Sequence, residues 1–276
     1  MAENRKVNTG AKDIEAWIHR TLGVTEAQLI DIMSYGMLLF ALITFVLLQI
    51  HKAPYGRYSN PKVWGFGINS KLAWFLQELP SFMVPVLLAL FTDISNTSTA
   101  GKVLIGMYLL HYFQRTFIYP FKLRGGKATT LTAFVAAVVF CCYNGFIQGG
   151  YHLHVSAYPD TWLTDGRFLV GFCLFILGWL INLHSDSILR NLRKPGETGY
   201  KIPEGGLFDY VSGANFFGEI VEWTGFAIAS WSLPALAFSV YTTCNIGPRA
   251  IHHHTWYLQK FDNYPKSRTA LVPFLL

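Results

Sequence analysis

Ionisable side chains stand inside two segments of the chain that are otherwise apolar. In the later segment Asn215, Glu219 and Glu222, spaced at i, i+4 and i+7, share one face of a helix. In the earlier segment Asn182 and Asp186 lie one helical turn apart. An Asp, Lys or Arg at the centre of a membrane-spanning helix costs roughly 2.5–3.5 kcal/mol on insertion scales. These groups therefore favour a functional use over the alternative, a polar network that only fixes helix packing.

Two further apolar segments carry candidates for acid catalysis. Gln77 and Glu78 interrupt one of them, and a neutral carboxylic acid at Glu78 can donate a hydrogen bond that polarises a carbonyl group. In the next, Tyr112 shares a helical face with Tyr108 and Arg115, and its hydroxyl can serve as a weak acid or an oxyanion donor. If the two segments pack antiparallel, Glu78 and Tyr112 meet near mid-membrane. The alternative is that the tyrosine stripe only packs.

Basic residues gather where apolar segments end. We expect one helix to close at Gly247 and another to open at Pro248, because proline suits the first turn of a helix. One face of that further helix carries Arg249, His253, Tyr257 and Lys260. We define the basic collar as these residues together with Arg57, Arg124, Arg190, Arg193 and Lys201. The collar suits charge-assisted bonds to the phosphates of a ligand or contact with anionic lipid headgroups, and the alignment of Arg, His and Tyr favours phosphate.

The sequence predicts neither a soluble-type dinucleotide motif nor a metal site. The stretch GFGINS at 65–70 has two glycines of a dinucleotide fingerprint but lacks the third glycine and a βαβ unit. The histidine run at 252–254 and the pair His152 and His154 are expected on opposite sides of the membrane, the pair in an external connection. No HxxxH or HxxHH box occurs in the sequence. We therefore expect no metal.

The composition is that of a membrane protein. Hydrophobic residues make up 52% of the 276 residues and charged residues only 14%, against about 25% charged residues in soluble domains. The aromatic share of 16% suits aromatic belts at both membrane interfaces. The net charge of +6 is spread over the loops, so we expect no nucleic-acid partner. All four cysteines lie in apolar runs and are expected to be buried small hydrophobes.

The apolar segments predict an all-α fold, a polytopic membrane protein with a seven-transmembrane helix bundle. The segments cover residues 32–50, 72–91, 103–119, 131–148, 168–183, 207–223 and 225–246. A tight turn near 223–225 is expected between the last two. Residues 1–28 read as a polar N-terminal extension without signal-peptide features, and 29–276 as a single membrane domain with a cytoplasmic C-terminal helix and tail.

The distribution of Lys and Arg predicts an orientation. The first five connections hold four, one, three, one and four of these residues in turn. Because cytoplasmic loops carry an excess of Lys and Arg, the odd-numbered connections are expected in the cytoplasm. The tail after residue 246 is also basic, which places the C-terminus in the cytoplasm and the N-terminus outside or in the lumen. Four basic residues ahead of the first segment argue the other way.

Several stretches resemble the steroid 5α-reductase (3-oxo-5α-steroid 4-dehydrogenase) family. They are AWFLQELPSF at 73–82, HYFQRTFIYP at 111–120, the run at 182–223, WSLPALAF at 231–238, RAIHHHTWYL at 249–258 and DNYPKSRTALVPF at 262–274. The match runs in order from about residue 55 to the C-terminus. It is most similar to the type 2 enzyme, whereas enoyl-CoA and polyprenol reductases share mainly the C-terminal half. The family's Arg-Gly-Arg-Pro turn is matched only in part, by RGGK at 124–127.

The resemblance implies an enzyme that uses NADPH to reduce the 4,5 double bond of a 3-oxo-4-ene steroid by hydride transfer to the β-carbon. By matched position, Glu78 and Tyr112 are its catalytic residues, which bind and polarise the 3-keto oxygen. The positions implied to bind the cofactor are Asn182, Asp186, Arg193, Tyr200, Asn215, Glu219, Arg249, His253 and Tyr257. The positions implied to border the substrate pocket are Trp74, Gln77, Glu222 and Trp223.

The expected partners are a steroid substrate and membrane lipid, with no obligate protein partner. The expected location is the endoplasmic reticulum or a bacterial inner membrane. A related membrane enoyl-CoA or polyprenol reductase is the alternative enzyme. A lipid or sterol transporter or receptor, which would use the buried acids as a proton relay, is the alternative of a different class.

Overall fold

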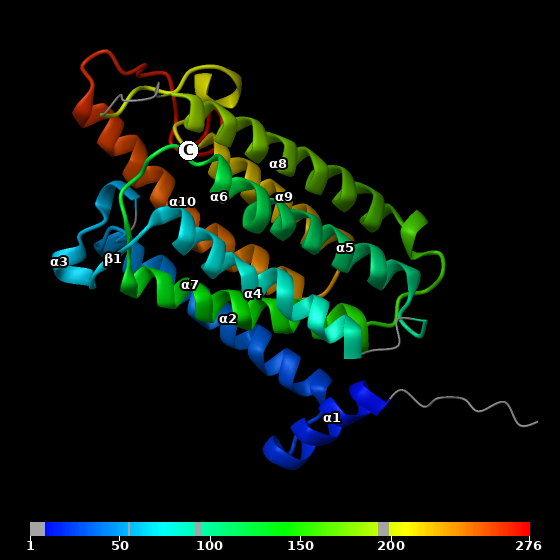
Figure 1. Ribbon diagram of the computed structural model, residues 1–276. Helices are drawn as coiled ribbons and strands as arrows, with labels where there is room; N and C mark the ends of the chain where they lie inside the picture. The colour runs from blue at the N-terminus through cyan, green and yellow to red at the C-terminus, as the bar shows by residue number, and fades with distance from the viewer. Residues whose placement is uncertain (1–8, 55, 92–94, 193–198) are drawn as a thin grey trace, which may run out of the picture.

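Helices account for nearly all of the regular structure (Figure 1). The fold is that of a computed structural model, which describes residues 9–54, 56–91, 95–192 and 199–276. The long helices are α1 (Thr9–Leu22), α2 (Glu26–Ile50), α4 (Ser70–Phe91), α5 (Thr99–Phe113), α7 (Leu131–Gly150), α8 (Gly166–Asn191), α9 (Ala214–Ser230) and α10 (Leu233–Lys260). The short elements are η1 (Gly56–Tyr58), α3 (Pro61–Trp64), β1 (Gly67–Ile68), the π-helix η2 (Gln114–Ile118), α6 (Tyr119–Lys122), β2 (Thr129–Thr130), the π-helix η3 (Tyr151–Val155), η4 (Trp162–Thr164) and η5 (Gly206–Asp209).

Within the described residues, four helices are long and apolar enough to cross a membrane. They are α2, α4, the continuous α7–η3 helix over Leu131–Val155, and α8. Large apolar side chains such as Leu39, Leu90 and Val139 are exposed on these helices, as contact with lipid tails requires. The predicted all-helical membrane protein is confirmed. That α5, α9 and α10 also cross, which seven spans would require, stays a prediction.

The two ends of the bundle differ (Figure 1). The helix α1 lies at one end, beyond the start of α2, and the short elements α3 and β1 lie at the other, near the C-terminus. At that second end β1 pairs antiparallel with β2, with Gly67 opposite Thr130. Ser59 donates a hydrogen bond of 2.7 Å to the backbone oxygen of Ala128 beside this pair. The connections before α4 and before α7 are thereby joined to each other.

The helices α8 and α9 pack backbone against backbone through glycines. Gly178 and Gly218 face each other, as do Gly171 and Gly225 one heptad away. A Cβ added at Gly218 would lie 2.6 Å from the backbone nitrogen of Asn182, and one at Gly178 would meet the backbone nitrogen of Glu222. Small residues at such positions let membrane helices approach closely. The contact fixes the polar residues of α8 and α9 relative to each other.

A side-chain cap begins α8. Asp165 accepts a hydrogen bond of 2.8 Å from the backbone N–H of Arg167 and pairs with its guanidinium at 2.9 Å. These bonds lower the pKa of the Asp165 carboxyl to about 2. The carboxylate is therefore ionised at neutral pH and complements the positive end of the helix dipole.

The predicted turn near 223–225 is wrong, because α9 continues to Ser230. The chain turns at Trp231, which has a left-handed φ of 47°, and Ser232 caps α10 by accepting a hydrogen bond from the backbone of Ala235. Gly225, in the predicted turn, lies inside α9 against α8. A glycine needed for close helix approach has the same sequence signature as one needed for a turn.

The predicted break at Gly247 and Pro248 is also wrong. The helix α10 runs without interruption from Leu233 to Lys260 with Pro248 inside it. Proline inside a membrane-protein helix is tolerated where neighbouring helices and side chains satisfy the freed backbone groups. The basic-collar residues on α10 therefore belong to the same continuous helix as the α10 residues that line the interior of the bundle.

The expectations for His152 and two cysteines need correction. His152 is fully buried in η3, at the end of the α7 helix, and His154 beside it forms an ion pair of 2.9 Å with Glu26. The pair of histidines is thus part of the packed bundle and not of an external connection. Cys142 and Cys173 are exposed, whereas Cys141 is buried as predicted.

Candidate active site

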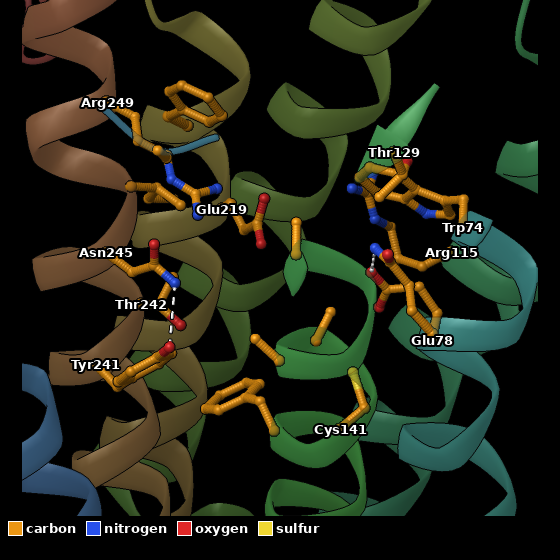
Figure 2. Close-up of a pocket in the computed structure, with 18 of the residues that line it drawn as sticks. Trp74, Glu78, Arg115, Thr129, Cys141, Glu219, Tyr241, Thr242, Asn245 and Arg249 are labelled. Atoms are coloured by element: carbon orange, nitrogen blue, oxygen red, sulfur yellow. Dashed lines mark hydrogen bonds between the residues drawn. The ribbon is translucent and has the colours of Figure 1, made fainter. Parts of the chain in front are cut away.

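A cavity of ≈ 390 Å³ opens among α4, α5, α7, α8, α9 and α10. Its volume lies in the range of about 300–1,000 Å³ usual for small-molecule pockets. Phe40, Phe140 and Tyr241 make a stacked apolar side, with the Tyr241 ring 4.4 Å from that of Phe140. Polar side chains gather on two facing walls (Figure 2). The cavity combines a large apolar surface with a few polar groups, as ligand sites do.

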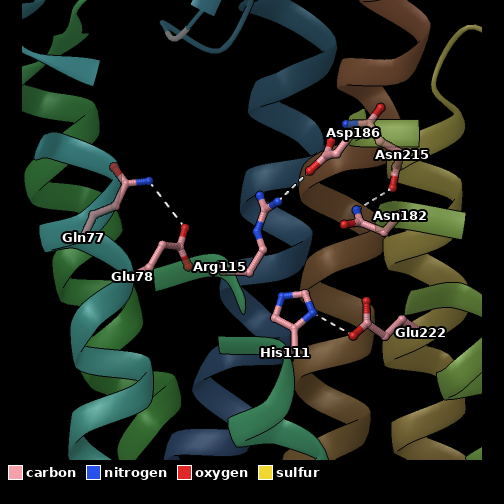
Figure 3. A network of polar contacts seen from close by, with 8 residues as sticks. All are labelled: Gln77, Glu78, His111, Arg115, Asn182, Asp186, Asn215 and Glu222. Atoms are coloured by element: carbon pink, nitrogen blue, oxygen red, sulfur yellow. Dashed lines mark hydrogen bonds and ion pairs between the residues drawn. The ribbon is translucent and has the colours of Figure 1, made fainter. Parts of the chain in front are cut away.

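The predicted catalytic pair lies on the first wall. Glu78 and Gln77 come from α4 and Tyr112 from α5, and all three line the cavity. The Gln77 side-chain amide donates to Glu78 Oε1 at 3.5 Å (Figure 3). The Tyr112 ring packs on Tyr108, with centroids 4.6 Å apart. Glu78 and Tyr112 thus line one cavity, as expected if their helices pack antiparallel.

An ion pair that the sequence did not predict closes this wall. Arg115 donates to Asp186 Oδ2 at 2.9 Å, and both side chains are at least nine-tenths buried. The guanidinium also stacks over Trp74 at 4.8 Å and Tyr119 at 4.3 Å. Breaking one partner of such a buried pair leaves an uncompensated charge. Asp186, Trp74 and Arg115 all line the cavity, so the pair fixes groups that a ligand would touch.

The second wall comes from α9 and α10. Asn215 and Glu219 on α9 face the cavity together with Asn245 and Arg249 on α10 (Figure 2). Asn182 does not reach the cavity itself. It lies behind Asn215 and donates to the backbone oxygen of that residue at 3.0 Å (Figure 3). Amide, carboxylate and guanidinium groups on one wall suit a ligand with amide, hydroxyl and phosphate groups.

Glu222 and Trp223 lie behind the cavity and do not border it. Glu222 is fully buried and hydrogen-bonds His111 Nδ1 at 2.7 Å (Figure 3). Trp223 packs on the His111 ring, with centroids 4.6 Å apart, and on Tyr112 at 6.0 Å. His111 does line the cavity. The two predicted pocket residues therefore support the side chains that border the pocket.

Three predicted cofactor residues lie in an aromatic cluster around Arg57, a residue of η1. Arg57 stacks over Tyr200 at 5.2 Å and over Tyr257 at 4.9 Å, and donates to the Tyr257 hydroxyl at 3.4 Å. His253 contacts the rings of Tyr58 and Phe216. Tyr200, His253 and Tyr257 do not line the cavity. Arg193 lies outside the described residues.

Comparison with known proteins decides the family. The sequence profile of the family described as 3-oxo-5-alpha-steroid 4-dehydrogenase matches residues 127–276. The "3-oxo-5-alpha-steroid 4-dehydrogenase 1" of Bos taurus is 46% identical over 256 residues, which covers 92% of this chain and 99% of the relative. The chain belongs to the steroid 5α-reductase family. It is accordingly an oxidoreductase of a family named for steroid substrates.

Type 1 and type 2 relatives of the steroid 5α-reductase family match this chain about equally. The type 1 protein of Mus musculus is 49% identical over 253 residues, covering 91% of this chain and 98% of the relative. The type 2 protein of Homo sapiens is 47% identical over 251 residues, with the same two coverages. These identities do not favour type 2 as predicted. Coverage above nine-tenths also shows that the similarity begins before residue 55.

The cavity is also lined by residues that the sequence patterns did not select. His111, Arg115, Cys141 and Asn245 all line the cavity. The helical pattern could have selected Arg115, since it shares a face with Tyr112 and is an ionisable residue in an apolar segment. His111 is on another face of the same helix, and the periodicity of Tyr112 could not select it.

Proposed function

We propose that this member of the steroid 5α-reductase family reduces the 4,5 double bond of a 3-oxo-4-ene steroid, with NADPH as the reductant. The observation that carries the proposal is that Glu78 and Tyr112 share one cavity with the polar wall of Asn215, Glu219 and Arg249. Two groups that can donate hydrogen bonds to a keto oxygen thus lie opposite groups suited to a nucleotide. The curated relatives are named for this steroid reaction.

Tyr112 and Glu78 act on the keto oxygen of the substrate. Negative charge develops on that oxygen as the double bond accepts a hydride, so a donor aimed at the oxygen stabilises the transition state more than the ground state. The Tyr112 hydroxyl supplies this donor, and Glu78 supplies a second one when its carboxyl is neutral. The rings of Tyr108 and Trp223 pack on Tyr112 and exclude water from that side of it, which strengthens the bond that its hydroxyl donates.

The residues present fit a nicotinamide dinucleotide. NADPH, when bound, supplies the hydride. Asn215 and Glu219 offer an acceptor and donor set for its amide and hydroxyl groups, and Arg249 a cation for phosphate. Asn182 supports this wall through its bond to the Asn215 backbone, and Asp186 is bonded to Arg115 on the opposite wall.

The aromatic cluster around Arg57 extends the proposed cofactor site. Arg57 Nη1 is buried without a hydrogen-bond partner among the described residues. A buried guanidinium nitrogen without a partner suits a phosphate oxygen. We assign Tyr200, His253 and Tyr257, together with Arg193, to the remote part of the nucleotide, so that the basic collar binds phosphate and not lipid headgroups.

The proposed topology follows the Lys and Arg pattern. Seven helices cross the membrane, with the end that holds α3, β1 and the C-terminus in the cytoplasm and the N-terminus outside. The membrane is that of the endoplasmic reticulum or a bacterial inner membrane. Residues 29–276 make one reductase domain and 1–28 an N-terminal extension. Membrane lipid and the steroid are the partners, with no obligate protein partner.

One assay tests the proposed function. Purified protein in lipid nanodiscs is given NADPH and a 3-oxo-4-ene steroid, and the absorbance of NADPH is followed while the product is identified by mass. We expect steroid-dependent oxidation of NADPH and a product two hydrogens heavier than the substrate. Oxidation with an enoyl-CoA but not with steroids would assign the related reductase activity instead. Binding of the steroid with no NADPH oxidation would indicate a transporter or receptor.

A further inference from the structure

The pair of His111 and Glu222 is not used by the mechanism above. His111 Nδ1 and Glu222 Oε1 are 2.7 Å apart, and the side chains are 3% and 0% exposed. His111 lines the cavity, and its ring lies 5.1 Å from that of Tyr112. Nδ1 is engaged by Glu222, while Nε2 has no hydrogen-bond partner in the described part of the chain. The imidazole thus links a deeply buried carboxyl to the wall of the cavity (Figure 3).

Burial determines how many protons the pair holds. Glu222 Oε2 is buried without a hydrogen-bond partner among the described residues, so an unneutralised carboxylate there would be poorly solvated. The nearby cation Arg115 already pairs with Asp186. A pair with no net charge is therefore favoured over one with a net negative charge.

An acid proton on Oε2 would be a buried O–H without an acceptor among the described residues. The two other neutral arrangements of the pair both leave a proton on Nε2. If Glu222 is a carboxylic acid, it donates to Nδ1, and the neutral imidazole carries its hydrogen on Nε2. If Glu222 is a carboxylate, it accepts from Nδ1–H of an imidazolium, which again carries a hydrogen on Nε2. In both arrangements the cavity wall carries an N–H group at Nε2, and a second proton lies between Nδ1 and Glu222.

Other ionisable groups surround this imidazole on the packed helices. Those that line the cavity with it are Glu78 on α4, Tyr112 on α5, Arg115 in η2, Cys141 on α7, Asp186 on α8, Glu219 on α9, and Tyr241 and Arg249 on α10. Among these, the cation Arg115 is bonded to Asp186, and Glu219 and Glu78 add negative charge to the same cavity when they are ionised. Their combined effect supports the neutral pair.

We propose that the His111–Glu222 pair stores the proton that the reduced steroid takes up at its α-carbon. The proposal rests on the proposed function, in which hydride reaches the β-carbon and the π electrons of the double bond form an enolate. The α-carbon then bonds the proton of His111 Nε2, whose N–H electron pair stays on the ring, and the keto group re-forms. The proton between Glu222 and Nδ1 remains on the ring, so imidazole stays neutral and Glu222 becomes a carboxylate. After the product leaves, a proton taken up from the bulk solvent restores the neutral pair.

The chain contains a matched control for this pair. His154 Nδ1 and Glu26 Oε1 are 2.9 Å apart, with side chains 5% and 6% exposed, and neither residue lines the cavity. A purely structural buried His–Glu pair should respond in the same way at both places. A proton store should respond only at Glu222.

The experiment compares Glu222→Gln with Glu26→Gln in nanodiscs. A glutamine at 222 can still hydrogen-bond Nδ1 but cannot pass on a proton, so binding and acid catalysis are separated. We expect Glu222→Gln to lower kcat at least about 100-fold, a typical general-acid contribution. The solvent deuterium isotope effect on kcat should rise. The KM for the steroid and the KM for NADPH should each stay within about threefold of the wild-type value. Glu26→Gln should keep the wild-type kcat and isotope effect. Wild-type kcat in Glu222→Gln would overturn the proposal.

A measurement on the unmodified protein needs no activity. Nitrogen NMR of labelled histidine, assigned with His111→Gln, reports whether Nε2 carries a proton. We expect a protonated Nε2 at neutral pH, and a bare Nε2 would overturn the proposal even if Glu222→Gln failed to fold. If the wild type showed the protonated nitrogen but reduced no enone, the proposed function would fail while the protonation of the pair stood.

Discussion

At the scale of single residues, the cavity divides its polar groups between two tasks. Glu78 and Tyr112 lie on one wall, and Asn215, Glu219 and Arg249 on the other. The division matters because a group that meets the reacting oxygen changes kcat, whereas one that holds a remote part of a ligand changes KM. The two walls can therefore be tested separately by kinetics.

The Tyr112→Phe variant tests the donor on the first wall. It removes one hydroxyl and keeps the ring that packs on Tyr108 and Trp223. We expect kcat to fall about 10²–10³-fold, the effect of losing one oxyanion donor. Tyr143→Phe is the control, because the Tyr143 hydroxyl donates to the Met33 backbone outside the cavity. Near-native kcat in folded, NADPH-binding Tyr112→Phe would remove Tyr112 from the mechanism.

Two substitutions at Glu78 test the protonation state of its carboxyl. Glu78→Gln keeps a donor, so it should retain at least about tenfold more activity than Glu78→Leu if the native carboxyl is neutral and donates to the keto oxygen. The measurement is kcat with the steroid on variants of equal thermal stability. Equal loss in both variants would instead indicate an ionised Glu78 that only accepts hydrogen bonds.

Arg249→Ala tests the second wall. Removing a guanidinium that binds phosphate should raise the KM for NADPH about tenfold or more with a smaller change in kcat. The control is Arg167→Ala, since Arg167 pairs with Asp165 at the start of α8, away from the cavity. Equal catalytic efficiencies of the wild type with NADPH and NADH would contradict the phosphate role of the basic collar.

At the scale of elements, the α8–α9 contact holds the two walls in register. Gly178 of α8 lies against the backbone of Glu222, and Gly218 of α9 against that of Asn182. Each glycine is thus in contact with a residue that supports the site. A side chain at either position would separate the helices and move Asp186 relative to Glu219.

Gly178→Ala tests this packing. The added Cβ meets backbone atoms of α9 that cannot rotate away, so we expect a loss of about 1–3 kcal/mol in stability, as in other overpacked cores. Gly106→Ala is the matched control, because a Cβ at Gly106 of α5 meets nothing within 4 Å. Thermal melting in nanodiscs should show a lower midpoint for Gly178→Ala alone. Equal midpoints would mean that α8 and α9 separate without cost.

At the scale of the whole molecule, the two ends of the bundle differ, and the second end holds a buried ion pair. The strand β1 and the C-terminus lie at the first end, and α1 lies at the second (Figure 1). Pro54 and Thr129, from the connections at the first end, line the cavity, whereas the Glu26–His154 pair lies at the start of α2. A cofactor that is soluble in water must reach the site from the first end. The proposed orientation puts that end in the cytoplasm.

Cysteine labelling tests the orientation. Single cysteines placed at Ala157 and at Ser267 in a cysteine-free background should react with a membrane-impermeant maleimide from opposite sides of sealed vesicles. Because the basic tail is cytoplasmic by the positive-inside rule, position 267 should label from the cytoplasmic side. Labelling of both positions from one side would contradict the topology with seven spans.

Much of the fold could be predicted from the sequence alone, because the signals that specify helices and their faces are local. A 3.6-residue period in long apolar segments specifies helices in a membrane, and it correctly placed Glu78 and Tyr112 on faces that meet one cavity. The same period aligned Asn215 with Glu219. Tyr200, which lies in a loop, was reached only through the family resemblance.

Only the tertiary structure decided which helix each face meets. A helical pattern shows that Glu222 is on a buried face but not that its partner is His111, 111 residues away in the chain. Likewise, the sequence cannot distinguish Gly225 in a helix contact from a glycine in a turn, nor Pro248 inside α10 from a proline that begins a helix. In each case the outcome depends on the atoms of a neighbouring helix, and these are set by packing and not by local preference.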